Sequence, residues 1–172
     1  MSFTFNSGKQ FQVAEEGNHQ AVLAAFIDVG KSEGEFGEKD QVIAVWVLDV
    51  NDEESGEPLI AVQYLTKSVH EKANLTKVVK ALTGSFPSLA FKFDDLMALL
   101  GRGATLALTH VEKEGRVRSK IVLVSKPDAK AETVAVPEGW EPPAGLTKGA
   151  LGVYTSALLA AQNDEKTAED VI

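Results

Sequence analysis

The chain has 172 residues, a formal net charge of -8 and no cysteine. This length suits one domain with appendages rather than two domains, and the absence of cysteine excludes disulfides, thiolate metal sites and cysteine nucleophiles. No stretch is long and apolar enough for a membrane helix, and the first residues lack a secretory pattern, so we expect a cytoplasmic protein with no membrane partner.

The charge is unevenly distributed along the chain. Residues 1–59 hold 3 basic and 12 acidic side chains, residues 60–126 hold 11 and 5, and residues 127–172 hold 3 and 8. A basic middle between acidic ends gives a local field that attracts phosphates even though the average charge repels them. The net charge therefore does not exclude a nucleic-acid partner.

The first predicted strand follows an N-terminal arm of residues 1–18. Apolar side chains alternate over residues 19–29, a pattern typical of a half-buried strand. Alternation places Leu23 on the apolar face and Phe26 on the opposite face, together with polar side chains. Phe26 is therefore a candidate exposed aromatic.

A polar loop that contains glycines is predicted for residues 31–39. It would join the first two strands, where small β-barrels often place a binding loop. The candidate ligand contacts in this loop are two cations and its single aromatic, namely Lys31, Lys39 and Phe36.

Two further strands are predicted over residues 41–50 and 59–66, joined by an acidic turn. The first has the strongest strand pattern of the chain, with a wholly apolar face that contains Trp46, so we expect Trp46 in the core. Tyr64 in the next strand is another candidate exposed aromatic.

Two short helices are predicted after the third strand. Apolar side chains recur at helical spacing from Leu75 to Leu82, and Gly84 supplies the stop. A second helix opens near Phe93 and ends before Gly101. Both are too short to be stable alone and must pack on the sheet.

A hairpin is predicted over residues 105–124, with Glu114 and Gly115 as its turn. A two-residue turn pairs Lys113 with Arg116 and Thr109 with Lys120. One face then collects four cations, Lys113, Arg116, Arg118 and Lys120. The opposite face collects Leu106, Leu108, Ile121 and Leu123. Like charges that face each other across strands are unfavourable, so an anionic partner would offset the cost of this cluster.

The composition changes after Pro127. Prolines and glycines predict that residues 128–172 form a C-terminal extension, in which residues 134–148 are an extended linker lying against the sheet or away from it. Residues 151–162 have the spacing of a small helix, and the acidic end, residues 163–172, is typical of a flexible tail.

Three strands, a helical insertion and a final hairpin follow the element order of the OB-fold, a five-stranded barrel that often binds oligonucleotides through one open face and its loops. We therefore predict a mainly β protein, with an OB-fold domain over residues 19–127 between the arm and the extension.

Catalytic and metal sites are not indicated by the sequence. His19, His70 and His110 do not have metal-ligand spacing. Asp94 and Asp95 lie where a helix N terminus favours negative charge, so capping explains them better than acid/base catalysis. No nucleophile elbow, dinucleotide-binding loop or Walker-type loop occurs. We expect neither enzyme activity nor a cofactor.

Binding of a single nucleic-acid strand needs cations that follow the phosphates and exposed aromatics on which bases stack. The predicted hairpin supplies the cations, and the candidate aromatics are Phe26, Phe36 and Tyr64. The alternative for the hairpin face is a surface that is merely solvated.

The middle of the chain resembles a family of bacteriophage and prophage proteins. The resemblance is carried by residues 64–75 (YLTKSVHEKANL), 93–101 (FDDLMALLG) and 108–110 (LTH), and it extends over residues 19–127. Members of that family travel with replication and recombination functions and are thought to carry an OB-fold that binds single-stranded DNA. The resemblance implies the same fold and partner here, in a bacterial host cytoplasm, but it supplies no binding residues.

The C terminus is similar to the tail of bacterial single-strand-binding proteins, because acidic residues precede Val171 and Ile172. That likeness implies recruitment of replication or recombination proteins. We therefore expect a sequence-independent single-stranded DNA-binding protein of phage replication or recombination. The alternative is a non-enzymatic adaptor that contacts proteins through its acidic loops and tail, and a homo-oligomer is open in either case.

Overall fold

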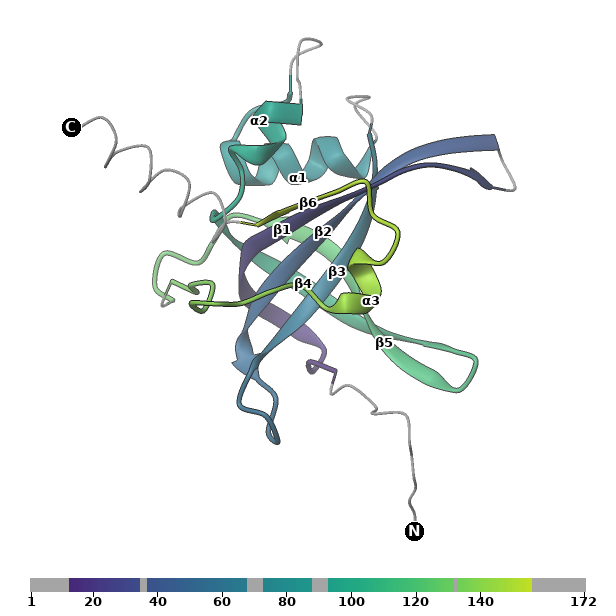
Figure 1. Ribbon diagram of the computed structural model, residues 1–172. Helices are drawn as coiled ribbons and strands as arrows, with labels where there is room; N and C mark the ends of the chain where they lie inside the picture. Colours follow the sequence, from purple (N-terminus) through teal and green to yellow (C-terminus); the bar gives the residue numbers. More distant parts are fainter. Residues whose placement is uncertain (1–12, 35–36, 68–72, 88–92, 132, 156–172) are drawn as a thin grey trace, which may run out of the picture.

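The computed structural model describes residues 13–34, 37–67, 73–87, 93–131 and 133–155. Within these ranges the fold is mainly β, with one antiparallel sheet of six strands and three short helices (Figure 1). No helix in this part of the chain is long and apolar enough to cross a membrane.

The elements follow the predicted order up to the final hairpin. The strands are β1 (Gly17–Gly34), β2 (Gly37–Asn51), β3 (Pro58–Thr66), β4 (Gly103–Lys113), β5 (Arg116–Ser125) and β6 (Gly152–Thr155). Between β3 and β4 lie the helices α1 (Asn74–Thr83) and α2 (Phe93–Met97), and α3 (Ala144–Thr147) precedes β6.

The sheet is organised around β1. Its strand order is β3-β2-β1-β4-β5, and β6 pairs with β1 beside this path. The first part of β1 pairs with β4 and the longer second part with β2, while β6 pairs with residues 25–28. The edge strands β3 and β5 contact each other without pairing. The sheet is therefore not closed into a barrel, and the predicted five-stranded barrel is not confirmed in this detail.

The main core lies on one face of the sheet, which we call the inner face. Trp46 is fully buried there, as predicted, together with Leu65 and Leu106. The buried side of α1, formed by Leu75, Val78 and Val79, packs against this cluster. Because α1 is a short helix, this packing and not its own hydrogen bonding stabilises it.

A β-bulge in β1 changes which side chains enter this core. The pairing with β2 shifts between Leu23 and Ala25, so the alternation of faces is reversed after Ala24. Leu23 and Phe26 consequently point to the same side, and both belong to the main core. Phe26 is 0% exposed, so the prediction that it is an exposed aromatic is wrong.

The opposite, outer face of β1 and β2 is covered by the C-terminal extension. Half-buried side chains such as Val136, Trp140 and Val153 pack against the outward-facing residues of both strands, which are Val22, Ala24, Ala25, Ile27, Ile43, Val45 and Val47. Figure 1 shows the extension, in yellow-green, crossing the sheet. The linker therefore lies against the sheet, one of the two predicted alternatives.

The described part of the C-terminal extension ends in a strand. Residues 152–155, which the sequence pattern assigns to a helix, pair with β1 as β6. The Leu151 backbone N–H donates to the Asp28 carbonyl at 2.7 Å and starts this pairing. A free position beside β1 explains the difference, since an unpaired strand edge recruits extended chain. The predicted acidic tail, residues 163–172, lies outside the described residues.

Candidate nucleic-acid interface

The β4–β5 hairpin has the predicted register from its turn to the Leu108–Ile121 pair. Glu114 and Gly115 have φ angles of 54° and 77°, and positive φ at both positions is the requirement of a two-residue type I′ turn. Lys113 pairs with Arg116 and Thr109 with Lys120. The turn therefore fixes which side chains share a face.

The predicted cations project from the outer face of this hairpin. Leu108 and its partner Ile121 pack in the core on the inner face, so the alternate side chains of β5 point outward. Arg116, Arg118 and Lys120 are exposed, and their side chains form no ion pair with any described residue. We call these three residues the β5 cation row. Lys113 lies opposite Arg116 on the neighbouring strand β4, and its side chain lies outside the described residues.

A second bulge, at Val122, ends the cation row. The pairing of β4 with β5 shifts between Ala107 and Leu108, and Leu123 pairs with Ala107. Leu123 is therefore exposed, and Val124 packs on the core in its place, so the prediction that Leu123 faces the core is wrong. Val122 is 62% exposed. Two apolar side chains thus meet solvent directly beyond Lys120.

Tyr64 is the predicted aromatic that the structure shows at the surface. It is 57% exposed and lies on β3 opposite Ile43, hence on the outer face. Because β3 contacts β5, Tyr64 and the β5 cation row lie on strands that contact each other.

The structure does not bring the first loop to the cation row. Lys31 is exposed in β1, Lys39 belongs to β2 with its side chain outside the described residues, and Phe36 also lies outside them. Figure 1 shows the described ends of β1 and β2 at their shared hairpin well apart from the tip of the β4–β5 hairpin. A ligand would have to cross the sheet to contact both.

Lys67, near the base of the β1–β2 hairpin, is already neutralised. Its Nζ lies 2.8 Å from Asp28 Oδ1 and 2.9 Å from Asp40 Oδ1. The hydrogen bond from Lys67 holds the pKa of Asp28 below its ordinary value, against the opposing effect of burial. Burial alone would lower the pKa of Lys67, but the hydrogen bonds to both carboxylates raise it. Both ion pairs of Lys67 lie within the fold, so this lysine has a structural role.

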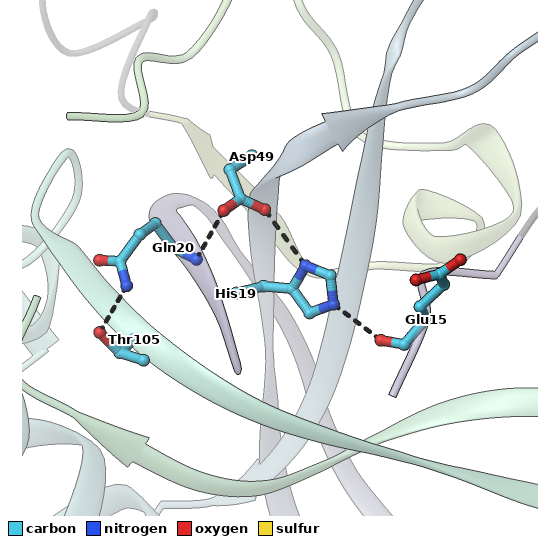
Figure 2. A network of polar contacts seen from close by, with 5 residues as sticks. All are labelled: Glu15, His19, Gln20, Asp49 and Thr105. Atoms are coloured by element: carbon cyan, nitrogen blue, oxygen red, sulfur yellow. Dashed lines mark hydrogen bonds and ion pairs between the residues drawn. The ribbon is translucent and has the colours of Figure 1, made fainter. Parts of the chain in front are cut away.

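A polar network anchors the start of β1 (Figure 2). His19 Nδ1 lies 3.2 Å from Asp49 Oδ1, and its Nε2 lies 2.7 Å from the Glu15 carbonyl oxygen. The Gln20 backbone N–H donates to Asp49 at 3.0 Å, and the Gln20 side chain donates to Thr105 at 2.9 Å. All of these hydrogen bonds link one segment of the fold to another, so His19 has a structural role.

A basic groove, which sequence reasoning missed, runs between α1 and β5. This α1–β5 groove has a volume of about 410 Å³, and its charged lining residues are Lys77, Lys80 and Lys126. Lys80 Nζ lies 4.2 Å from the ring centroid of Phe86, an aromatic that is 54% exposed. The three-residue spacing of Lys77 and Lys80 on one helix face was the available signal.

The larger cavity has the opposite charge. It measures about 810 Å³ and lies between the β2–β3 turn and the extension. Its charged lining residues are all acidic, namely Asp49, Glu57, Glu138 and Glu141. This cavity disfavours phosphates, so the basic surfaces of β5 and α1 are the better candidates for an anionic ligand.

Comparison of the chain with family models and with curated proteins finds no match.

Proposed function

We propose that this protein binds single-stranded DNA without sequence preference, through the outer face of the β4–β5 hairpin. The observation that carries the proposal is the β5 cation row, whose three side chains are exposed and form no ion pair with any described residue. On a chain with a net charge of -8, cations aligned on one strand are an electrostatic cost that a phosphate backbone offsets.

The strand order supports an OB-fold as part of this proposal. β1 pairs with both β2 and β4, the helices α1 and α2 lie between β3 and β4, and the edge strands β3 and β5 contact each other. This is the connectivity expected of a partly open five-stranded Greek-key barrel. The resemblance of residues 19–127 to phage proteins is the reason for proposing replication or recombination as the setting of this function.

The proposed site differs in one respect from that of an OB-fold that binds oligonucleotides through the open face of its barrel. The outer face of β1 and β2 is occupied by the extension, so it is not available to bases. The proposal therefore places the strand along β5 and the exposed edge of β3, with Tyr64 as the candidate stacking residue.

The test is a fluorescence anisotropy titration of a labelled oligo-dT strand. Arg118→Glu/Lys120→Glu should weaken binding by at least 10-fold, since ion contacts to phosphates dominate such affinities. Lys130→Glu/Lys148→Glu, an equal charge change at exposed positions of the extension, is the matched control. Equal affinities of the two double variants would show that the hairpin face is not the site.

The alternative function is a protein adaptor. The acidic cavity beside the β2–β3 turn favours it, because a basic segment of a partner would complement the four carboxylates. Wild-type protein that binds no oligo-dT at low salt but captures a replication protein, with loss of capture in Glu138→Lys/Glu141→Lys, would establish this alternative.

A further inference from the structure

The α1–β5 groove has a charge opposite to that of the protein as a whole. The whole chain has 25 acidic and 17 basic side chains, yet among the described residues the groove is lined by three lysines and by no acidic residue. Lys77, Lys80 and Lys126 are exposed, and none forms an ion pair with a residue that the structure describes. The groove therefore favours an anionic ligand.

The groove also offers apolar surface to such a ligand. The bulge in β5 exposes Val122 and Leu123 along its wall. Phe86 lies beyond Lys80 with its ring in cation–π distance of the ammonium group. Cations beside exposed apolar and aromatic side chains are the combination that holds phosphates and bases of a single strand together.

The groove follows the β5 cation row along the same strand, on the side where α1 packs, whereas the row projects from the outer face. Arg116, Arg118 and Lys120 occupy the first half of β5, and residues 121–126 line the groove. At about 3.3 Å per residue the strand is roughly 33 Å long, enough for several nucleotides. This succession along one strand favours one extended polyanion over a short acidic peptide, which would need the groove alone.

We infer that the α1–β5 groove is a second contact region for single-stranded DNA. Lys77, Lys80 and Lys126 contact phosphates, and Phe86 stacks on a base at the far end of the path. The inference rests on the proposed function, since it extends the strand that the β5 cation row binds. It adds length to the site, so it affects long strands more than short ones.

The experiment measures the affinity of oligo-dT of about 6 and about 20 nucleotides at two salt concentrations. Lys77→Glu/Lys80→Glu should bind the long strand about 10-fold more weakly and show a salt slope smaller by about 1.4, at about 0.7 per lost phosphate contact. Its affinity for the short strand should stay near that of the Lys130→Glu/Lys148→Glu control. Thermal melting confirms that each variant is folded.

A second pair of variants tests the aromatic. Phe86→Ala should weaken binding of the long strand about 10-fold, whereas Phe86→Trp should retain it and show fluorescence quenching on binding. A merely structural role of Phe86 predicts a lower melting temperature for Phe86→Ala with unchanged affinity, and that result would contradict the inference.

The outcomes separate the two proposals. If the hairpin variant loses binding and the groove variants behave as the control, the groove inference is overturned and the proposed function stands. If wild-type protein binds neither oligonucleotide, both are overturned. If the groove variant keeps its DNA affinity but loses binding of a synthetic peptide of residues 156–172, the groove takes an acidic peptide, and the inference is likewise wrong.

Discussion

The carboxylate of Glu16 accepts the hydroxyl hydrogen of Thr109 at 2.7 Å. It also accepts the backbone N–H of His110 at 3.0 Å, and these two hydrogen bonds, that of His110 first, hold its pKa below the ordinary value. Thr109 lies directly opposite Lys120. An ionised acid therefore stands at one end of the β5 cation row.

Replacement of this acid should strengthen DNA binding. Glu16→Gln keeps an oxygen that accepts both hydrogen bonds but removes the negative charge, so affinity for oligo-dT should rise about 3-fold at low salt and return to the wild-type value at high salt. Glu15→Gln, next to it and exposed, is the control and should change little. An unchanged affinity of Glu16→Gln would place the DNA path away from Lys120.

The ion cluster of Lys67 should make stability depend on pH in a defined direction. The folded pKa of Asp28 is lowered, so its contribution is complete above the ordinary value near 3.8 and is lost as the pH falls through the folded value. The folded pKa of Lys67 is raised, so its contribution is present below about 10.5 and is lost only as the pH rises through the folded value.

Asp28→Asn tests this cluster by urea unfolding. At neutral pH the free energy of unfolding should fall by about 1 to 2 kcal/mol, between the values for surface and for buried ion pairs. The difference from wild type should shrink as the pH approaches 3. Glu138→Gln, an exposed acid of the extension, serves as the control. If the difference in unfolding free energy between Asp28→Asn and wild type did not depend on pH, the charge of the Asp28 carboxylate would not be the source of the stabilisation.

The extension should behave as part of the folded unit. Trp140 packs on the outer face of β1 and β2 and is half-buried, so Trp140→Ala should lower the free energy of unfolding by about 2 kcal/mol, less than for a fully buried tryptophan. Leu151→Ala removes a side chain that is 75% exposed and should stay within about 0.5 kcal/mol of wild type. Equal stabilities of both variants would contradict the packing described here.

The hairpin turn contains a removable strain. Glu114 has a φ of 54° without being glycine, and asparagine is preferred at this position of a type I′ turn. Glu114→Asn should raise the free energy of unfolding by about 0.5 kcal/mol, measured by thermal melting. Gly115→Ala should lower it by about 1 kcal/mol. A melting temperature that falls in Glu114→Asn would argue against the turn type.

The hairpin could be predicted because its determinants are local. Glu114 and Gly115 fix the turn, and the turn fixes the pairs on either side. The two bulges could not be predicted, because they are set by the neighbouring strand. Residues 21–27 and 121–124 are apolar without interruption, so nothing in the sequence marks the bulges at Ala24 and Val122, and simple alternation assigns Phe26 and Leu123 to the wrong face.

One pattern in the sequence indicates that the outer face of the sheet is covered. Residues 42–48 are apolar without interruption, and Ile43, Val45 and Val47 are buried on the side away from Trp46. A strand that is apolar on both faces is buried on both faces. That pattern requires a second layer, and residues 133–155 supply it.

Because β1 shares its hydrogen bonds with β2, β4 and β6, none of these strands can detach without exposing one of its edges. Amide hydrogens near Ala25 and Ile27 should therefore be the slowest to exchange with deuterated solvent, and their exchange should report global unfolding. The β4–β5 hairpin and the extension both pair with β1, so they would then melt in a single cooperative transition.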